Sequence, residues 1–282
     1  MPKFGPAGNS DSFFADGNKS LIQAPGWVAR QGLDAYEVQF GRGVRSTEAS
    51  ATAFGAKAQQ HNIAVSIHAP YYISLASVDP QKRENSIRYI LESAQAVSWM
   101  GGNRIVVHPG GLGGLSREGA TELAIQTLQA AQVALDENGL SHVHICPETM
   151  GKINQLGDLH EVMQMCKVDE RFLPCIDFGH LNSRTHGEVN SEEAFESIYQ
   201  TIYQELGEER AQGFHSHFSK IEYSAGGEKR HLTFADTVYG PEPMALLEVL
   251  YRHQSNPTII CESSGTQAED ALAMKNMFQS II

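Results

Sequence analysis

Short apolar segments alternate with longer amphipathic segments along the whole chain, and this alternation constrains the fold more than any other feature. The short segments have the β-branched character of buried strands and lie near residues 3–8, 35–40, 64–69, 104–108, 143–148, 173–178, 213–218 and 258–263. The longer segments have helical periodicity near residues 19–31, 47–61, 81–100, 117–138, 155–166, 191–206, 241–253 and 267–281. Such alternation indicates parallel strands joined by helical crossovers. Eight repeats favour a closed (β/α)8 barrel, or TIM barrel, over an open sheet.

The length of 282 residues suits one such barrel, which typically needs about 250 residues. Because no Pro- or Ser-rich linker divides the chain, we expect a single domain over residues 1–282. No apolar run of about 18 residues predicts a transmembrane helix, and the first residues do not resemble a secretory signal. The four cysteines form no CxxC pair, which favours buried, reduced thiols. We therefore expect a cytoplasmic monomer with no membrane partner.

Ionisable residues stand at or just beyond the end of one expected strand after another. The set consists of His68, His108, Glu148, Asp177, His180, His215 and Glu262. Solvent exposure explains a single residue of this kind, but not six strands with the same property. The carboxyl ends of all strands in a barrel meet at one mouth, where barrel enzymes place their catalytic residues.

The residue types at these positions indicate a metal site. A lone histidine on a strand is usually a hydrogen-bonded core residue, but here several imidazoles converge with three acids. Imidazole and carboxylate together are the ligands of zinc, manganese or iron, and the acids would repel one another without a cation. No G-x-S-x-G nucleophile motif is present. Cys146 and Cys175 lie two residues before Glu148 and Asp177, so they are expected to pack beneath the site.

Six motifs carry a family resemblance: SIHAPYYISL, VVHPGG, CPET, CIDFGH, FHSHFSK and IICES. In this order and spacing they resemble the endonuclease IV family of apurinic/apyrimidinic endonucleases, over essentially the full chain. The resemblance implies a barrel whose mouth holds two or three zinc ions, with manganese or iron as possible substitutes. It also implies hydrolysis of DNA on the 5′ side of an abasic site, by in-line attack of a metal-bridging hydroxide on phosphorus.

The resemblance further implies a role for each matching residue. The implied metal ligands are His68, His108, Glu148, Asp177, His180, His215, His231 and Glu262. Glu148 would bridge the first and second ions, and His180 and His231 would hold the third. Glu148 and Glu262 are the expected catalytic carboxylates. Tyr72 and Arg45 are the expected contacts to abasic-site DNA.

The chain departs from the family pattern in the loop after the seventh strand. The family has a D-x-H element there, but this sequence reads GEKRH and places Lys229 where the aspartate is expected. A protonated lysine cannot bind a cation. Glu228 or His217 would then complete the third site, or that site would be weak. The opening FGPAGNSDSF likewise replaces the family's G-x-H-x-S stretch.

The formal charge of −12 argues against simple electrostatic binding of nucleic acid. Several bound divalent ions would nevertheless make the mouth locally attractive to phosphate. The charge and the missing aspartate leave open a sugar isomerase or epimerase of the xylose-isomerase-like barrel type. A metal- or DNA-binding module without turnover is a third hypothesis.

Overall fold

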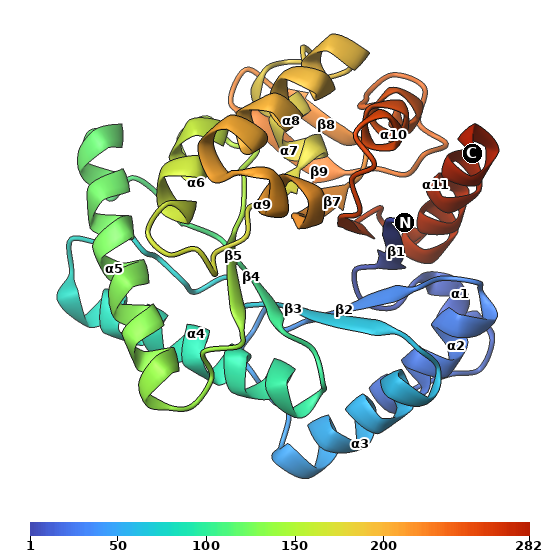
Figure 1. Ribbon diagram of the computed structural model, residues 1–282, viewed down its shortest axis with the longest axis horizontal. Helices are drawn as coiled ribbons and strands as arrows, with labels where there is room; N and C mark the ends of the chain where they lie inside the picture. Colours follow the sequence, from blue (N-terminus) through green and yellow to red (C-terminus); the bar gives the residue numbers. More distant parts are fainter.

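Eight parallel strands form the centre of the computed structural model, which describes residues 1–282 (Figure 1). They are β1 (Lys3–Pro6), β2 (Ala35–Gln39), β3 (Ala64–His68), β4 (Arg104–Val107), β5 (His144–Pro147), β6 (Cys175–Asp177), β7 (His215–Phe218) and β10 (Thr258–Cys261). Hydrogen bonds join them in the orders β2-β3-β4-β5 and β1-β10-β7-β6. Parallel bridges between Ala7 and Glu37 and between Glu148 and Cys175 connect the two sheets. The strands therefore close into a barrel.

Helices surround the barrel on all sides (Figure 1). The principal ones are α2 (Ala24–Arg30), α3 (Glu48–Gln60), α4 (Pro80–Trp99), α5 (Arg117–Glu137), α6 (Leu159–Cys166), α8 (Glu192–Leu206), α10 (Pro243–Arg252) and α11 (Gln267–Ile281). Their starts follow local chemistry: the Asp79 side chain accepts a hydrogen bond from Gln81 N at the start of α4, and Ser116 does the same for Gly119 N at the start of α5. Such caps satisfy backbone donors that have no partner within the helix.

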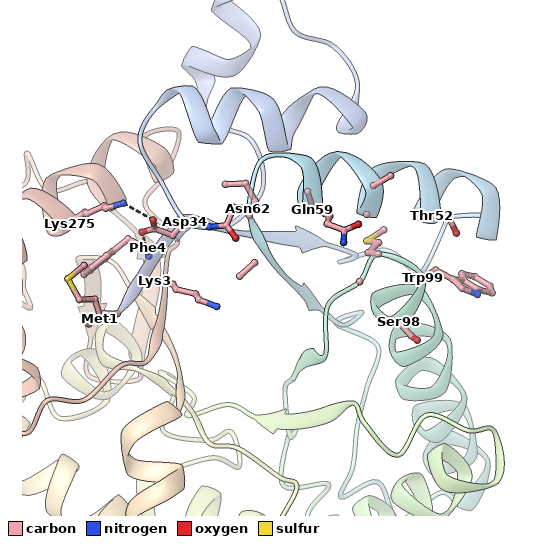
Figure 2. Close-up of a pocket in the computed structure, with 18 of the residues that line it drawn as sticks. Met1, Lys3, Phe4, Asp34, Thr52, Gln59, Asn62, Ser98, Trp99 and Lys275 are labelled. Atoms are coloured by element: carbon pink, nitrogen blue, oxygen red, sulfur yellow. Dashed lines mark hydrogen bonds and ion pairs between the residues drawn. The ribbon is translucent and has the colours of Figure 1, made fainter.

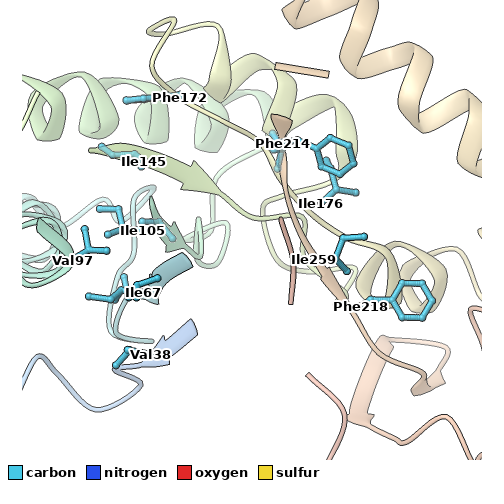
Figure 3. Packing of buried hydrophobic residues seen from close by; sticks show 14 of the residues in the cluster. Val38, Ile67, Val97, Ile105, Ile145, Phe172, Ile176, Phe214, Phe218 and Ile259 are labelled. Carbon is cyan, nitrogen blue, oxygen red and sulfur yellow. The ribbon is translucent and has the colours of Figure 1, made fainter. Parts of the chain in front are cut away.

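Side-chain alternation along the strands separates the packing core from the polar interior. Outward-facing residues such as Ile67, Ile105 and Ile145 pack against the helices in one continuous core of 61 buried residues (Figure 3). Residues of the opposite parity point into the barrel. There, only two small apolar clusters lie beneath the mouth, including one that contains Cys146 and Cys175. Because side chains alternate between the two faces of a strand, the polar residues next to these outward-facing residues point into the barrel.

Several short elements were not expected from the sequence. The chain adds α1 (Asp11–Ala15), α7 (Phe178–Arg184) and α9 (Glu208–Gly213), and the helix expected near residues 19–31 begins as a 3-10 turn at Leu21–Gln23 that leads into α2. The segment after β7, expected to be a loop, is instead an antiparallel hairpin of β8 (Ile221–Ser224) and β9 (Gly227–His231). Its pairing register shifts between Glu222 and Tyr223. Both α7 and the hairpin supply residues to the mouth of the barrel.

The expected TIM barrel is confirmed, and each of the eight predicted strands is present. All four cysteines are buried and free of disulfides, in agreement with the expected reduced thiols. None of the helices combines the length and the apolar character needed to cross a bilayer.

Candidate metal centre

The polar strand ends meet at one mouth of the barrel. His68 and Asp177 are the last residues of β3 and β6, while His108, Glu148 and Glu262 follow β4, β5 and β10 directly. Three of them, His68, His108 and Glu262, line a cavity of ≈ 560 Å³ together with residues from α7 and the hairpin. Glu148 and Asp177 are fully buried beside these side chains. The carboxyl ends of the strands thus form the cavity, as expected from the sequence.

The first group of side chains comprises His68, His108 and Glu148. The Nε2 atoms of the two histidines lie 3.1 Å apart. Glu148 Oε2 lies 3.4 Å from His68 Nε2 and 2.8 Å from His108 Nε2. Atoms that bind one zinc ion at about 2.0–2.2 Å are separated by roughly 3–3.5 Å, so this spacing fits three ligands of a single ion.

The second group comprises Glu148, Asp177, His217 and Glu262, whose ligand atoms all lie within 4.8 Å of one another. His217 Nδ1 is 3.0 Å from Glu148 Oε1 and 3.5 Å from Glu262 Oε2. Glu148 therefore uses its two oxygens in two directions, one toward each group. A carboxylate in this position is arranged to bridge two neighbouring ions.

The third group comprises His180, Glu228 and His231. His180 Nε2 lies 3.5 Å from Glu228 Oε2, and the two imidazole rings are 5.5 Å apart between centroids. His180 reaches the mouth because Asp177 caps α7: its Oδ1 accepts a hydrogen bond of 2.7 Å from His180 N. The β8–β9 hairpin brings Glu228 and His231 to the same place.

Three of the histidines have one ring nitrogen anchored outside the cavity. The Nδ1 atoms of His68 and His180 lie 2.9 Å from the carbonyl oxygens of Ala69 and Thr149. The Nδ1 atom of His231 lies 2.8 Å from Ser219 Oγ. A carbonyl oxygen can only accept, so Nδ1 of His68 and His180 carries a proton, and Nε2 is the nitrogen available to a cation. Histidines that bind metals characteristically have this support on the far nitrogen.

The electrostatics of the site also fit a cation. Burial raises the pKa of Asp177 to about 6, with repulsion from Glu262 and Glu148 adding to the effect and His180 opposing it. Asp177 Oδ2 is buried and has no hydrogen-bond partner. A fully buried carboxylate oxygen without a donor is costly, and a divalent ion would satisfy it. The donor set therefore fits divalent metals such as zinc.

One residue with an expected ligand role lies elsewhere. His215 is buried below the cavity, where its Nε2 is 2.8 Å from Glu37 Oε2. His217 takes the place expected for His215 in the second group. His215 does lie near Cys175 and His217, but burial raises the pKa of Cys175 well above its usual range, so this thiol stays protonated and is a poor ligand.

Lys229 does not occupy the third group. Its ammonium pairs with Glu222, which also accepts a 2.7 Å hydrogen bond from Arg230 Nε. Both cations face away from the cavity, while Glu228 faces into it. Of the alternatives that the sequence left open, the structure favours the one in which Glu228 completes the third group.

Neither expected DNA contact lines the cavity. Tyr72 is exposed and its ring lies 6.1 Å from that of Tyr89, and Arg45 is exposed on the loop before α3. The neighbouring Tyr71 lines the cavity instead, with its ring 5.6 Å from His68 and 5.5 Å from His108. The tyrosine pair was visible in the sequence, but not which member faces inward.

The sequence analysis also missed cavity residues that are not part of the expected set of ionisable strand-end residues. The cavity beside the three groups is also lined by Gln39, Gln155, Gln267 and Lys152, and Glu37 lies fully buried beneath it. The one signal for Glu37 was an isolated acid within the apolar strand segment AYEVQF.

A larger cleft of ≈ 760 Å³ lies at the opposite, amino-terminal end of the strands. Figure 2 shows Lys3, Asp34 and Asn62 on its walls, with Lys275 pairing with Asp34 at 2.7 Å. It contains none of the three groups described above. The candidate site is therefore the smaller cavity at the carboxyl ends.

Comparisons with known proteins agree with this architecture. Residues 25–278 match the family model described as xylose isomerase-like TIM barrel. A protein of uncharacterized function from Methanocaldococcus jannaschii is 35% identical over 243 residues, 86% of each chain. A probable endonuclease 4 from Acholeplasma laidlawii is 30% identical over 131 residues, which is 45% of this chain and 44% of that protein.

Solved structures share the fold at low sequence identity. Endonuclease IV from Thermus thermophilus superposes with a TM-score of 0.67 at 18% identity, over 99% of this chain and 98% of that one. The 3-keto-D-glucoside 4-epimerase from E. coli superposes with a TM-score of 0.70 at 14% identity, over 99% and 100%. The chain belongs to the xylose isomerase-like TIM barrel family, and within it the sequence relatives support the resemblance to endonuclease IV.

Proposed function

We propose that this protein is a metal-dependent phosphodiesterase that hydrolyses DNA on the 5′ side of abasic sites. The observation that carries the proposal is the set of three adjoining ligand groups around one cavity, two of which share Glu148. Several oxygen atoms around the phosphorus of a phosphodiester carry negative charge or gain it during hydrolysis. Several cations in one cavity would stabilise that charge. Divalent ions bound there would supply Lewis acidity and charge neutralisation to the phosphate.

The remaining side chains have roles consistent with a phosphate substrate. Lys152 is the one lysine or arginine that lines the cavity, and Gln39, Gln155 and Gln267 add amide donors. Burial opposes ionisation of Glu262, but His217 and His231 lower its pKa below the usual value. Glu262 is also the most exposed carboxylate of the second group. We assign to it the acceptance of a proton from the attacking water.

Sugar epimerisation or isomerisation is the second candidate, favoured by one feature of the cavity. The second group alone provides four ligands, enough for a single ion, and three neutral glutamines stand beside it. Such a site could hold a ketose through its hydroxyl oxygens. The first and third groups would then have no part in the reaction.

This difference provides a direct test. Zinc- or manganese-loaded protein is assayed on a duplex with one abasic site and on a panel of ketoses, with His108→Ala and His231→Ala as variants of the first and third groups. We expect chelator-sensitive incision, with each variant at least 100-fold slower. Epimerisation without incision, retained by both variants, would overturn the proposed function in favour of the sugar reaction.

A further inference from the structure

We propose that Glu37 is a positioning residue that holds the ring of His217 in the orientation and tautomer needed to bind metal. The inference rests on the metal centre of the proposed function, but not on which reaction that centre catalyses. It concerns a side chain that touches none of the first or third groups and lies one layer below the cavity.

Glu37 makes four polar contacts in the interior of the barrel. Its Oε1 lies 2.9 Å from His217 Nε2 and accepts a 3.2 Å hydrogen bond from Gln39 Nε2. Its Oε2 lies 2.8 Å from His215 Nε2 and accepts a 2.8 Å hydrogen bond from Ser66 Oγ. The carboxylate is completely buried, so these donors are its substitutes for water.

The barrel register explains how a residue of β2 reaches β7. Glu37 pairs with Ser66, and two residues later Gln39 pairs with His68. Because residues two apart share a face, Glu37 points inward one layer deeper than Gln39, which lines the cavity. From that depth the glutamate side chain extends to the imidazoles of β7. The isolated acid in an otherwise apolar strand therefore has a defined partner.

The contact determines which nitrogen of His217 faces the cavity. An ionised carboxylate only accepts hydrogen bonds, so His217 Nε2 carries the proton that it donates to Glu37. Two imidazole nitrogens and a hydroxyl group surround the carboxylate at 2.8–2.9 Å, an environment of donors that suits its ionised form. His217 Nδ1 faces Glu148 Oε1 and Glu262 Oε2, 3.0 and 3.5 Å away. With Nε2 committed to Glu37, Nδ1 is the nitrogen that can give up its proton and bind a cation held between these carboxylates.

Carboxylate partners of metal-binding histidines typically change metal affinity about 10- to 100-fold when removed. Glu37→Gln should act in this way because an amide offers one accepting oxygen for two imidazole donors, and its NH2 group faces the other ring. Ser66→Ala is the matched control, since it removes the hydroxyl that donates to Glu37 Oε2 but leaves both contacts from Glu37 to the histidines.

The test measures metal binding without any substrate, so its result does not depend on the reaction. Cobalt(II) is titrated into metal-free wild type and variants, and both the stoichiometry and the visible absorption spectrum are recorded. We expect Glu37→Gln to weaken one ion by about 10- to 100-fold and to change its spectrum, while Ser66→Ala stays close to wild type. In a His217→Gln background, Glu37→Gln should have no further effect.

Unchanged cobalt affinity and spectrum in Glu37→Gln would overturn the inference, as would an equal effect of Glu37→Gln with and without His217. If Glu37→Gln does not fold, the histidine tautomer in the zinc-loaded wild type decides the question. Long-range proton–nitrogen NMR correlation spectra should show His217 protonated on Nε2, and a proton on Nδ1 would contradict the proposal.

Discussion

The orientation of single imidazole rings determines what the mouth of this barrel can bind. His68, His180 and His231 present Nε2 to the cavity because an oxygen atom contacts Nδ1 from behind. His217 presents the opposite nitrogen because Glu37 contacts Nε2. The same residue type thus serves in two orientations, and the buried oxygen behind each ring selects between them.

Variants of the third ligand group can test directly whether Glu228 or its neighbour Lys229 occupies the ligand position. Glu228→Gln should lower the affinity for one ion by at least about tenfold, because it removes an anionic ligand. Lys229→Asp should leave the stoichiometry unchanged, because Lys229 pairs with Glu222 outside the cavity. Elemental analysis after dialysis against limiting zinc measures both. A gain of one ion in Lys229→Asp would show that Lys229, and not Glu228, occupies the ligand position.

The pH dependence of metal binding follows from protons that the ions must displace. Burial raises the pKa of Asp177 to about 6 in the metal-free site, so the carboxylate binds a proton as the pH falls through that value. Buried His180, next to Asp177, and buried His217, near Glu262 and Glu37, also have pKa values well above the usual range.

The apparent metal affinity should therefore rise with pH, by about tenfold per unit for each proton displaced. Titrations of zinc against a competing chelator at about pH 5.5, 6.5 and 7.5 would measure the slope, with chelator affinities corrected at each pH. An affinity that does not change over this range would contradict the assignment of Asp177 and these histidines to the centre.

The residue types and their strand ends could be predicted from the sequence, but the choice between near neighbours could not. His215 and His217 have the same parity on β7 and both point inward, so only the depth of the cavity distinguishes them. The role of Glu37 depends on its reach across the barrel to His215 and His217. That distance is set by the closed tertiary structure and not by any local pattern.

At the scale of elements, the β8–β9 hairpin completes the site and is held by a close backbone contact. Glu228 N donates a 3.1 Å hydrogen bond to Gly151 O, and Lys152 forms an antiparallel bridge with Gly227. Gly227 has a φ of +89°, and a Cβ atom placed there would lie 2.2 Å from Gly151 O. The hairpin therefore reaches the loop after β5 only with a glycine at this position.

Gly227→Ala should displace the hairpin and with it Glu228 and His231. We expect loss of one ion while the other two remain, with a cost of at least about 1–2 kcal/mol from the left-handed backbone alone. Gly226→Ala is the matched control, because its Cβ would meet no atom closer than Ser224 Oγ at 3.9 Å. Metal content and thermal unfolding of the two variants provide the measurements. If Gly227→Ala still bound three ions, the third ligand group would not depend on the position of the hairpin, and the prediction would be wrong.

The strands and helices of the barrel could be predicted from the sequence because the apolar strand segments alternate regularly with long amphipathic helical segments. Its failure over residues 221–231 has a physical cause: the segment IEYSAGGEKRH is short and polar, and most of β9 is partly or fully exposed. The hairpin is defined by contacts with the β5–α6 loop, with Lys220, and with Ser219. Helix α7 was missed similarly, because its seven residues follow the strand end at Asp177 without a separate helical pattern.

For the whole molecule, the ion cluster is expected to contribute to stability as well as to chemistry. An ion at about 100 times its dissociation constant stabilises the folded state by about 2.7 kcal/mol. In a chain of this size each kcal/mol corresponds to roughly 2–4 °C. Chelation should therefore lower the melting temperature by roughly 5–10 °C per ion removed, and added zinc should restore it. Equal melting curves with and without chelator would argue against tightly bound ions.

The position of Glu148 across two ligand groups has a consequence for how the protein is loaded. An ion in the first group fixes one oxygen of this carboxylate and so orients the other toward the second group, 3.0 Å from His217 Nδ1. The two positions are thermodynamically linked, and each ion must alter the affinity of the other by the same factor. If that linkage is favourable, protein at limiting metal separates into empty and doubly loaded molecules, and half-loaded ones are scarce. Scarce metal would then limit how many molecules are competent rather than how competent each one is.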